Sequence, residues 1–511
     1  MINLSLATLA TAMNGQLVCH ESLKTRQVSN ITTDSREFAK QKQGKTAEQF
    51  AFLALKGPNF DAHRFAQQII DDGCKVLVVE HEIDNIDRNQ VAQIIVEDTR
   101  IALGNIGAYV KQQVAPKTIG ITGSSGKTTV KEMLAAILSR LGNVLATNGN
   151  FNNDIGVPLT LLRLEPKHDF AVIEMGANHL GEIDYTTALV KPDVAIINNI
   201  AAAHLEGFGD LDGVARAKGE IFSGLPTQGI ALYNHGSQYS SYWQESLKDK
   251  QIRTFSCAQN REDNTDNKAD SYSENIHLDE NGCAQFDLQS SLGTCVIKLS
   301  IPGKHNVCNA VAVAAIAIEC GATLNDIQLG LADMAPVQGR LNIHHLSETN
   351  VSNEISLIDD TYNANVESIK AAVALLASYS GKRILVLGDM GELGSEADHY
   401  HTEIGEYAKS QSIDVLLTLG LLSEHISNAF SLDNNAISVH FNERNDLQAY
   451  IVSLLISEDN SVQKNKILIK GSRSAHMEMV VNDIINWHVK QQQKDQLLSE
   501  NELNTNKQDI A

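Results

Sequence analysis

Short apolar runs alternate with longer segments of helical periodicity along most of this chain. In its middle part, strand-like runs cover residues 118–122, 170–175, 193–198 and 229–233, and each is followed by a glycine or a polar residue. Short runs of this kind, separated by helical segments, are typical of a parallel sheet that is covered by helices. The pattern therefore predicts an α/β fold, in which ligands gather at the carboxyl ends of the strands.

The segment KTIGITGSSGKTTV at residues 117–130 combines a strand, a glycine-rich loop and the start of a helix. In a cradle of this kind the backbone N–H groups at the helix start would face an anion, Lys127 would reach the outer phosphates, and the Thr128 hydroxyl could hold Mg²⁺. The spacing is shorter than the general P-loop pattern, which would place glycine where this chain has Ile121. The alternative is an ordinary glycine turn before a helix.

The same alternation of strands and helices occurs in three parts of the chain, and its 511 residues suit about three domains of roughly 150 residues each. We expect a small α/β domain over residues 1–112, a central P-loop parallel-sheet ATPase domain over 113–335 and a Rossmann-like domain over 336–490. Residues 491–511 contain few apolar side chains, and we predict a polar tail that is either a frayed helix or disordered.

The net charge, the length of the apolar runs and the cysteine spacing disfavour several classes of protein. The net charge of −21 disfavours a protein that coats nucleic acid, so we expect no nucleic-acid partner. No apolar run approaches the ~20 residues that span a bilayer, and we expect a protein that is not membrane-embedded. The 7 cysteines show no CxxC spacing, which argues against a disulfide framework or a zinc ribbon and fits a reducing cytoplasm.

Polar side chains after the other predicted strands are candidates for chemistry. Glu174 ends the run at 170–175, where a carboxylate on the phosphate side of the sheet is a natural Mg²⁺ ligand. His204 follows the next strand, although a lone histidine is more often structural. On pattern alone Lys218 is a solvated lysine on a helix face. The Asn- and Gly-rich loop at 147–153 suits either a substrate-holding loop or a plain surface loop.

Further candidates lie later in the central domain and in the two flanking domains. Asn309 begins an apolar helix and is placed to read a base edge or to cap the turn. Arg340 lies at the predicted hinge, from which its guanidinium would reach phosphate oxygens on domain closure. Asp360 ends a strand and suits a pair of ribose hydroxyls. Ser35 and Arg36 end a strand of the first domain, as anion-binding or ordinary turn residues.

Taken in order, these segments resemble the Mur ligase family, the ATP-dependent amide ligases that build the peptidoglycan stem peptide. The motifs that carry the resemblance are ITGSSGKTT, NNDIGVPLT, EMGAN, AHLEGFG, AKGEI, GKHNVCNA, DDTYNAN, LGDMGELG and KGSRS. The last three are most similar to members that add D-alanyl-D-alanine to UDP-N-acetylmuramoyl-tripeptide. The Asp-Asn-Pro-Arg signature of the members that add meso-diaminopimelate or lysine is absent from the sequence.

The resemblance implies roles for individual residues, with a UDP-sugar site in the first domain. It implies two Mg²⁺ ions and an N-carboxylated Lys218, with Lys127, Lys218, His204 and Arg340 as catalytic residues. The metal shell would be Thr128, Glu174, His204 and Lys218, and the UDP-linked substrate would contact Ser35, Arg36 and Asn150. The ATP site would consist of Thr122, Gly123, Ser124, Ser125, Gly126, Lys127, Thr128, Thr129, Asn309, Arg340 and Asp360.

The activity implied is ATP-dependent amide formation through an acyl phosphate, giving UDP-N-acetylmuramoyl-pentapeptide, ADP and phosphate, by a cytoplasmic monomer. Two other classes stay open. One is a related amide ligase, such as a folate ligase, that shares the phosphate loop. The other is a non-catalytic module that uses ATP as a switch. Substrate-dependent ADP release distinguishes a ligase from the switch, and the amino acid accepted distinguishes the two ligases.

Overall fold

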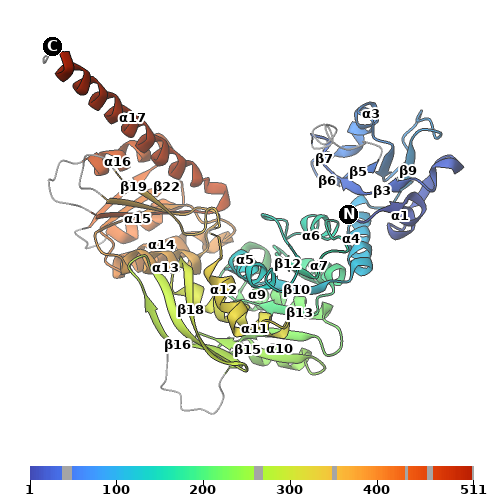
Figure 1. Cartoon of the computed structure of the whole chain (residues 1–511), viewed down its shortest axis with the longest axis horizontal. Helices are drawn as coiled ribbons and strands as arrows, with labels where there is room; N and C mark the ends of the chain where they lie inside the picture. The colour runs from blue at the N-terminus through green and yellow to red at the C-terminus, as the bar shows by residue number, and fades with distance from the viewer. Residues whose placement is uncertain are drawn as a thin grey trace. The chain divides into compact units, whose positions relative to one another are not determined.

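The computed structural model describes residues 1–36, 49–257, 269–335, 337–347, 354–431, 436–456 and 464–508 (Figure 1). The chain divides into two compact units. The first consists of Met1–Asn198, Ala215–Phe255 and Val313–Gly330, and the second of Asn199–Val214, Ser256–Ala312 and Leu331–Ala511. Both units alternate strands and helices, and the predicted α/β fold is confirmed.

The first unit begins with a sheet of strand order β2-β9-β8-β5-β4, in which β2 is antiparallel to its neighbour and the others run parallel. Apolar side chains of β5 and β8 pack with those of α3 in one core. Helix α4 then leads to the next sheet, and Asp98 caps its first turn by accepting two backbone N–H bonds. The bounds are β1 Leu4–Ser5, α1 Leu6–Ala12, β2 Gln16–Val18, β3 Gln27–Val28, β4 Asn30–Thr32, β5 Phe50–Leu53, β6 Lys56–Gly57, β7 Phe60–Asp61, α3 Ala66–Asp71, β8 Val76–Val79, β9 Ala92–Ile95 and α4 Thr99–Val114.

The next sheet has nine strands, in the order β11-β12-β10-β13-β14-β15-β16-β17-β18, and every described pair from β11 to β15 is parallel. Its parallel strands are apolar because helices cover a parallel sheet on both faces. The predicted strands at 118–122, 170–175, 193–198 and 229–233 are confirmed to within one residue at each end. From residue 117 to residue 256, without regard to the division into units, the bounds are β10 Lys117–Thr122, α5 Lys127–Leu138, β11 Val144–Ala146, α6 Gly156–Leu161, β12 Phe170–Glu174, α7 Glu182–Val190, β13 Val194–Ile197, α8 Leu205–Phe208, α9 Leu211–Gly219, β14 Ile230–Asn234, α10 Ser240–Ser246 and β15 Gln251–Ser256.

The second unit contains an antiparallel run β16-β17-β18 and a sheet of order β19-β20-β24-β21-β22-β23, parallel except for β19. From residue 271 to residue 508, without regard to the division into units, the bounds are β16 Ser271–Leu278, β17 Cys283–Ser290, β18 Gly293–Pro302, α11 His305–Glu319, α12 Leu324–Ala332, β19 Asn342–Ser347, β20 Glu354–Asp360, α13 Val366–Ser378, β21 Lys382–Gly388, α14 Ala397–Ser410, β22 Val415–Leu419, α15 Ser423–Ser431, β23 Ile437–Phe441, α16 Arg444–Ile456, β24 Lys464–Lys470 and α17 Glu478–Gln508.

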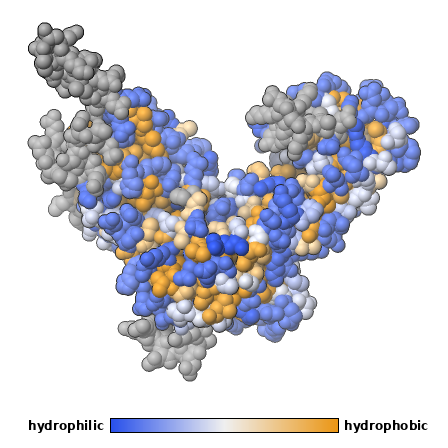
Figure 2. Space-filling view, viewed as in Figure 1, coloured by the Kyte–Doolittle hydropathy of each residue, from blue (hydrophilic) through white to orange (hydrophobic). Residues whose placement is uncertain are grey.

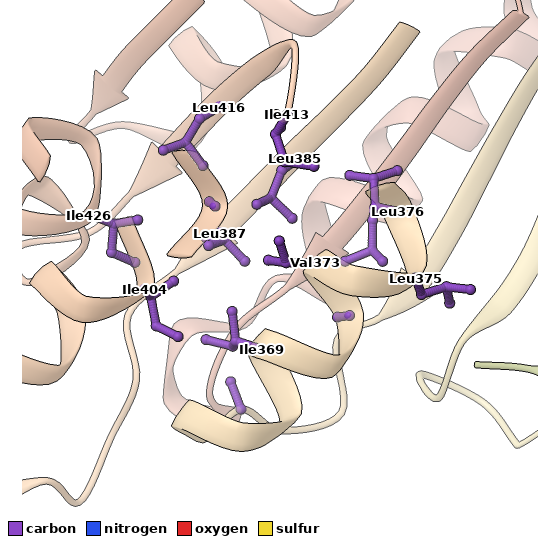
Figure 3. Close-up of a cluster of buried hydrophobic side chains, with 14 of the residues drawn as sticks. Ile369, Val373, Leu375, Leu376, Leu385, Leu387, Ile404, Ile413, Leu416 and Ile426 are labelled. Atoms are coloured by element: carbon purple, nitrogen blue, oxygen red, sulfur yellow. The ribbon is translucent and has the colours of Figure 1, made fainter. Parts of the chain in front are cut away.

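Successive residues of β21 contribute to opposite cores of this sheet. Leu385 and Leu387 pack with α13, α14 and α15 in one cluster (Figure 3). Ile384 and Val386 pack with α16 and α17 in the other. Strand side chains alternate between the two faces, so a strand that is apolar at every position is buried on both.

The tail adopts the helical one of its two predicted alternatives, because α17 continues as helix to Gln508. The cysteine spacing argued against a disulfide framework, but Cys257 and Cys308 form one disulfide, with their Cα atoms 5.1 Å apart. Sequence spacing missed this pair because 51 residues separate its members.

Hydrophobic and hydrophilic residues are interspersed on the molecular surface. On the face seen in Figure 2, hydrophobic residues lie among hydrophilic ones. Of the helices that the structure describes, none combines the length and the hydropathy needed to cross a bilayer.

Candidate active site

The phosphate loop connects the end of β10 to the start of α5. Gly126 has φ 75° and precedes the helix directly, in the left-handed region that L side chains rarely adopt. The Lys127 Nζ donates a 2.7 Å hydrogen bond to the Gly123 carbonyl, so the side chain folds back across the loop. From the end of β13, the Asn198 side chain donates to the Ser125 carbonyl at 3.1 Å. The predicted strand, loop and helix start therefore form one compact cradle.

Glu174 lies beside this cradle, on the strand next to β10. Its side chain is buried, and Oε2 accepts a 3.0 Å hydrogen bond from the Thr128 hydroxyl. Oε1 accepts a 2.8 Å bond from the Asn152 amide. The structure thus brings together two residues that lie 46 positions apart in the sequence, as the strand-end argument predicts.

The oxygen atoms of Thr128 and Glu174 are suitable ligands for Mg²⁺. Within the described ranges, no cluster of three or more His, Cys, Asp or Glu side chains is suited to hold a metal. A magnesium ion here would therefore complete its shell with phosphate oxygens, waters or a modified side chain.

Lys218 is fully buried near the end of α9. Its pKa is lowered to about 7 because burial disfavours the charged form and the Lys127 ammonium repels it, while Glu182 and Glu220 act in the opposite direction. The solvated position suggested by the helical pattern is therefore wrong. Trp243 packs behind this helix, and its indole Nε1 donates to the Ala215 carbonyl at 3.4 Å.

His204 belongs to the second unit and has φ 55°, in the left-handed region. Its Nδ1 lies 2.5 Å from the Glu392 Oε2. Glu392 lies in the LGDMGELG motif, which the sequence reasoning quoted without giving the residue a role. The part of His204 in a metal shell stays a prediction.

The carboxyl ends of β20 and β24 bring a buried ion pair together in the second unit. The Lys470 Nζ lies 2.7 Å from the Asp360 Oδ2, and the two side chains are only 3% and 13% exposed. The same ammonium donates to the Asn363 carbonyl at 2.8 Å. Lys470 begins the KGSRS motif but was not assigned a role, although its place at a strand end was the available signal.

Arg340 and Asn309 also lie in the second unit. The Arg340 guanidinium carbon is 4.4 Å from the centre of the Tyr362 ring, in a cation–π contact that sequence reasoning missed. The buried Asn309 amide donates to the Asn306 Oδ1 at 2.9 Å, and Asn306 in turn donates to the Pro302 carbonyl at 2.7 Å. Both predicted residues are thus held by neighbours from their own unit.

The predicted contacts for the UDP-linked substrate lie shortly after strands β4 and β11. The Arg36 guanidinium is bidentate to Asp34, with Nε 3.0 Å from Oδ1 and an NH2 nitrogen 2.7 Å from Oδ2. Ser35 lies between them in the chain and is half-buried, whereas Asn150 is exposed in the loop after β11. These assignments remain predictions.

Comparisons with known proteins agree with this geometry. Residues 121–317 match the Mur ligase middle domain, and residues 339–473 match the Mur ligase, glutamate ligase domain. The UDP-N-acetylmuramoyl-tripeptide–D-alanyl-D-alanine ligase of Escherichia coli is 46% identical, with 94% of this chain and 98% of that protein covered. The protein of the same name from Haemophilus influenzae is 43% identical, with the same coverages.

Solved structures show the same likeness. A crystal structure of MurF from Acinetobacter baumannii superimposes with a TM-score of 0.84 at 37% identity, covering 95% of this chain and 99% of that one. MurF ligase from Thermotoga maritima in complex with ADP shares the fold with a TM-score of 0.75 at 24% identity, covering 90% and 98%.

Proposed function

This chain belongs to the Mur ligase family, and we propose that it joins D-alanyl-D-alanine to UDP-N-acetylmuramoyl-tripeptide at the expense of ATP, in peptidoglycan precursor synthesis. The observation that supports this most directly is the Thr128–Glu174 contact beside the phosphate loop, in a chain that matches nearly the full length of ligases with this name. In this proposal residues 1–112 bind the UDP-sugar, residues 113–335 bind ATP, and residues 336–490 form the Rossmann-like domain. The protein is a cytoplasmic monomer.

The reaction has two steps that balance. The terminal carboxylate of the tripeptide attacks the γ-phosphorus of ATP, the bond to the β-phosphate oxygen breaks, and an acyl phosphate and ADP form. The neutral amine of D-alanyl-D-alanine then attacks the acyl carbon, and phosphate leaves as the amide forms and the amine loses a proton.

The main obstacle to the first step is electrostatic, because a carboxylate must approach a triphosphate. Lys127 and Arg340 supply positive charge at the phosphates, and the backbone N–H groups at the start of α5 hold their oxygens. Positioning and charge stabilisation of this kind account for most catalysis of phosphoryl transfer.

The oxygen donors of Thr128 and Glu174 fit Mg²⁺, which supplies charge neutralisation at the phosphates when it is bound. We include two such ions in the proposal, with His204 and Lys218 as further members of the shell. An unmodified lysine fits this role poorly because its ammonium has no lone pair to donate.

N-carboxylation of Lys218 resolves that mismatch. A pKa of about 7 leaves much of the buried side chain as the neutral amine at neutral pH. The amine nitrogen bonds to the carbon of CO₂ and loses a proton, which gives a carbamate anion. Lys127, which repels the ammonium, would attract this anion.

The proposed function is tested by phosphate release from the purified protein with ATP and UDP-N-acetylmuramoyl-tripeptide. D-Alanyl-D-alanine and single amino acids are added in turn. We expect release only with the dipeptide. Release with a single amino acid instead would favour a related amide ligase, and nucleotide binding without any release would favour a switch module.

A further inference from the structure

Lys131 lies on α5, three residues after Thr128, and its side chain is only 1% exposed. A buried ammonium is unfavourable unless hydrogen bonds replace its lost water. Here Nζ donates a 2.6 Å bond to the Thr147 carbonyl and lies 2.7 Å from the Glu132 carboxylate. Neither the phosphate-loop motif nor the proposed mechanism uses this residue.

Thr147 is the first residue after β11, which is the edge strand of its sheet. Its N–H donates to the Val172 carbonyl at 3.1 Å and so extends the pairing with β12. Its hydroxyl accepts the Glu174 N–H at 3.0 Å. The carbonyl points to the helix side, where the Lys131 ammonium meets it. An apolar side chain at position 131 would leave this buried carbonyl without that donor.

The loop that follows is attached to Glu174 at both ends. Thr147 receives the Glu174 backbone N–H, and the Asn152 amide donates to the Glu174 carboxylate. The Asn152 carbonyl also accepts the Gly176 N–H at 2.8 Å. Between these anchors, residues 148–151 are exposed. The direction of the Glu174 carboxylate therefore depends on where the loop is held.

We propose that Lys131 is a positioning residue for the ligase reaction. It holds Thr147 against α5, and through Thr147 and Asn152 it fixes the Glu174 carboxylate beside the Thr128 hydroxyl. In this role it acts through Thr147 and Asn152 and not by touching the reacting groups. A lysine suits the position because its long apolar stem crosses the core while its terminal ammonium makes a strong, charge-assisted bond. The inference rests on the proposed function.

The test compares Lys131→Met with Glu132→Gln. Methionine keeps the length of the stem and removes the donor, whereas Glu132→Gln removes the exposed ion-pair partner and keeps the bond to Thr147. For Lys131→Met we expect kcat to fall on the order of 100-fold, as for a small misplacement of catalytic groups, while ADP binding by calorimetry changes little. Glu132→Gln should turn over like wild type.

A second variant keeps the inference testable if Lys131→Met does not fold. Thr147→Val retains the lysine and removes the hydroxyl that accepts the Glu174 N–H, and it should lower kcat in the same way. In the variant that carries both substitutions, kcat should fall by less than the product of the two single fold-decreases, because both changes disrupt the same set of hydrogen bonds.

A merely structural Lys131 would give a lower melting temperature with unchanged kcat per folded molecule, and that result would overturn the inference. Unchanged kcat in Thr147→Val would also overturn it. Wild-type protein that releases no phosphate contradicts the proposed function itself, whereas active wild type with an equally active Lys131→Met contradicts only the role of Lys131.

Discussion

Lys218 and Lys127 repel each other across the phosphate-binding side of the first unit, and this repulsion adds to burial in lowering the Lys218 pKa to about 7. A protein core that brings two lysines together favours the loss or the masking of one charge. Lys127 is only partly buried and donates to the loop carbonyl of Gly123, whereas Lys218 is fully buried. The lowered pKa of Lys218 is what makes N-carboxylation of its amine possible near neutral pH.

Removing the phosphate-loop cation should abolish most of the activity. Lys127→Ala is expected to lower kcat by roughly 100- to 1,000-fold, the range seen when a single transition-state donor is lost. ADP formation with all three substrates present measures this. Lys117→Ala, an exposed lysine at the other end of β10, is the control and should remain active. Near-normal turnover of Lys127→Ala would contradict the phosphate-loop assignment.

Carboxylation of Lys218 predicts chemical rescue. Lys218→Ala should be inactive and should regain part of its activity with added acetate or another short carboxylate, which would occupy the place of the carbamate. Arg216→Ala, on an exposed position of the same helix, should be active without any additive. No rescue of Lys218→Ala, with ADP binding intact, would argue for a structural lysine.

The lowered pKa of Lys218 also predicts a pH dependence of stability. Its ordinary pKa is 10.5, and the folded value is about 7, so between these pH values the unfolded chain binds more protons than the folded one. This group therefore makes the free energy of unfolding rise with pH from about 7 to 10.5, by at most about 1.4 kcal/mol per pH unit. Below pH 7 the contribution is flat.

Lys218→Met lacks this contribution, so the difference in unfolding free energy between wild type and variant should grow in favour of wild type as the pH rises from 7 to 9. Urea unfolding in CO₂-free buffers measures it, because CO₂ would convert the amine to a carbamate. A difference that is constant with pH would mean that Lys218 keeps its proton in the folded state.

Because Asp360 and Lys470 form a buried ion pair, we expect the removal of either charge to destabilise the protein. Lys470→Met leaves the Asp360 carboxylate buried without this partner, which should cost about 3 kcal/mol of unfolding free energy. Lys466→Met on the same strand removes a 2.8 Å bond to the Ser356 hydroxyl and should cost about 1 kcal/mol. Equal losses in the two variants, measured by urea unfolding, would contradict a special role for the pair.

The local sequence pattern was sufficient to predict the secondary-structure elements and part of the candidate active site. The strand, loop and helix start at 117–130 follow from the apolar run, the glycines and the change of periodicity. The pairing of Thr128 with Glu174 follows from the rule that parallel strands end at one edge of the sheet. These features depend on neighbours in sequence or on a general property of parallel sheets, so they are predictable without coordinates.

Other features depended on packing between distant segments. The sequence analysis gave no role to Lys131 or Lys470, yet one contacts the Thr147 carbonyl and the other the Asp360 carboxylate. Arg340 stacks on Tyr362, and Glu392 approaches His204. No periodicity marks such partners, because each contact joins residues from separate segments of the chain.

By itself, the sequence determined an α/β ligase of this family, its phosphate loop and the strand-end positions of its candidate ligands, because short-range pattern and motif order encode them. Only the tertiary structure decided which charged side chains are buried and beside what. Burial and the neighbouring charges set the pKa of Lys218, and the cost of an unpaired buried charge explains the partners of Lys131 and Lys470. These are properties of three-dimensional surroundings, to which residues far apart in the chain contribute.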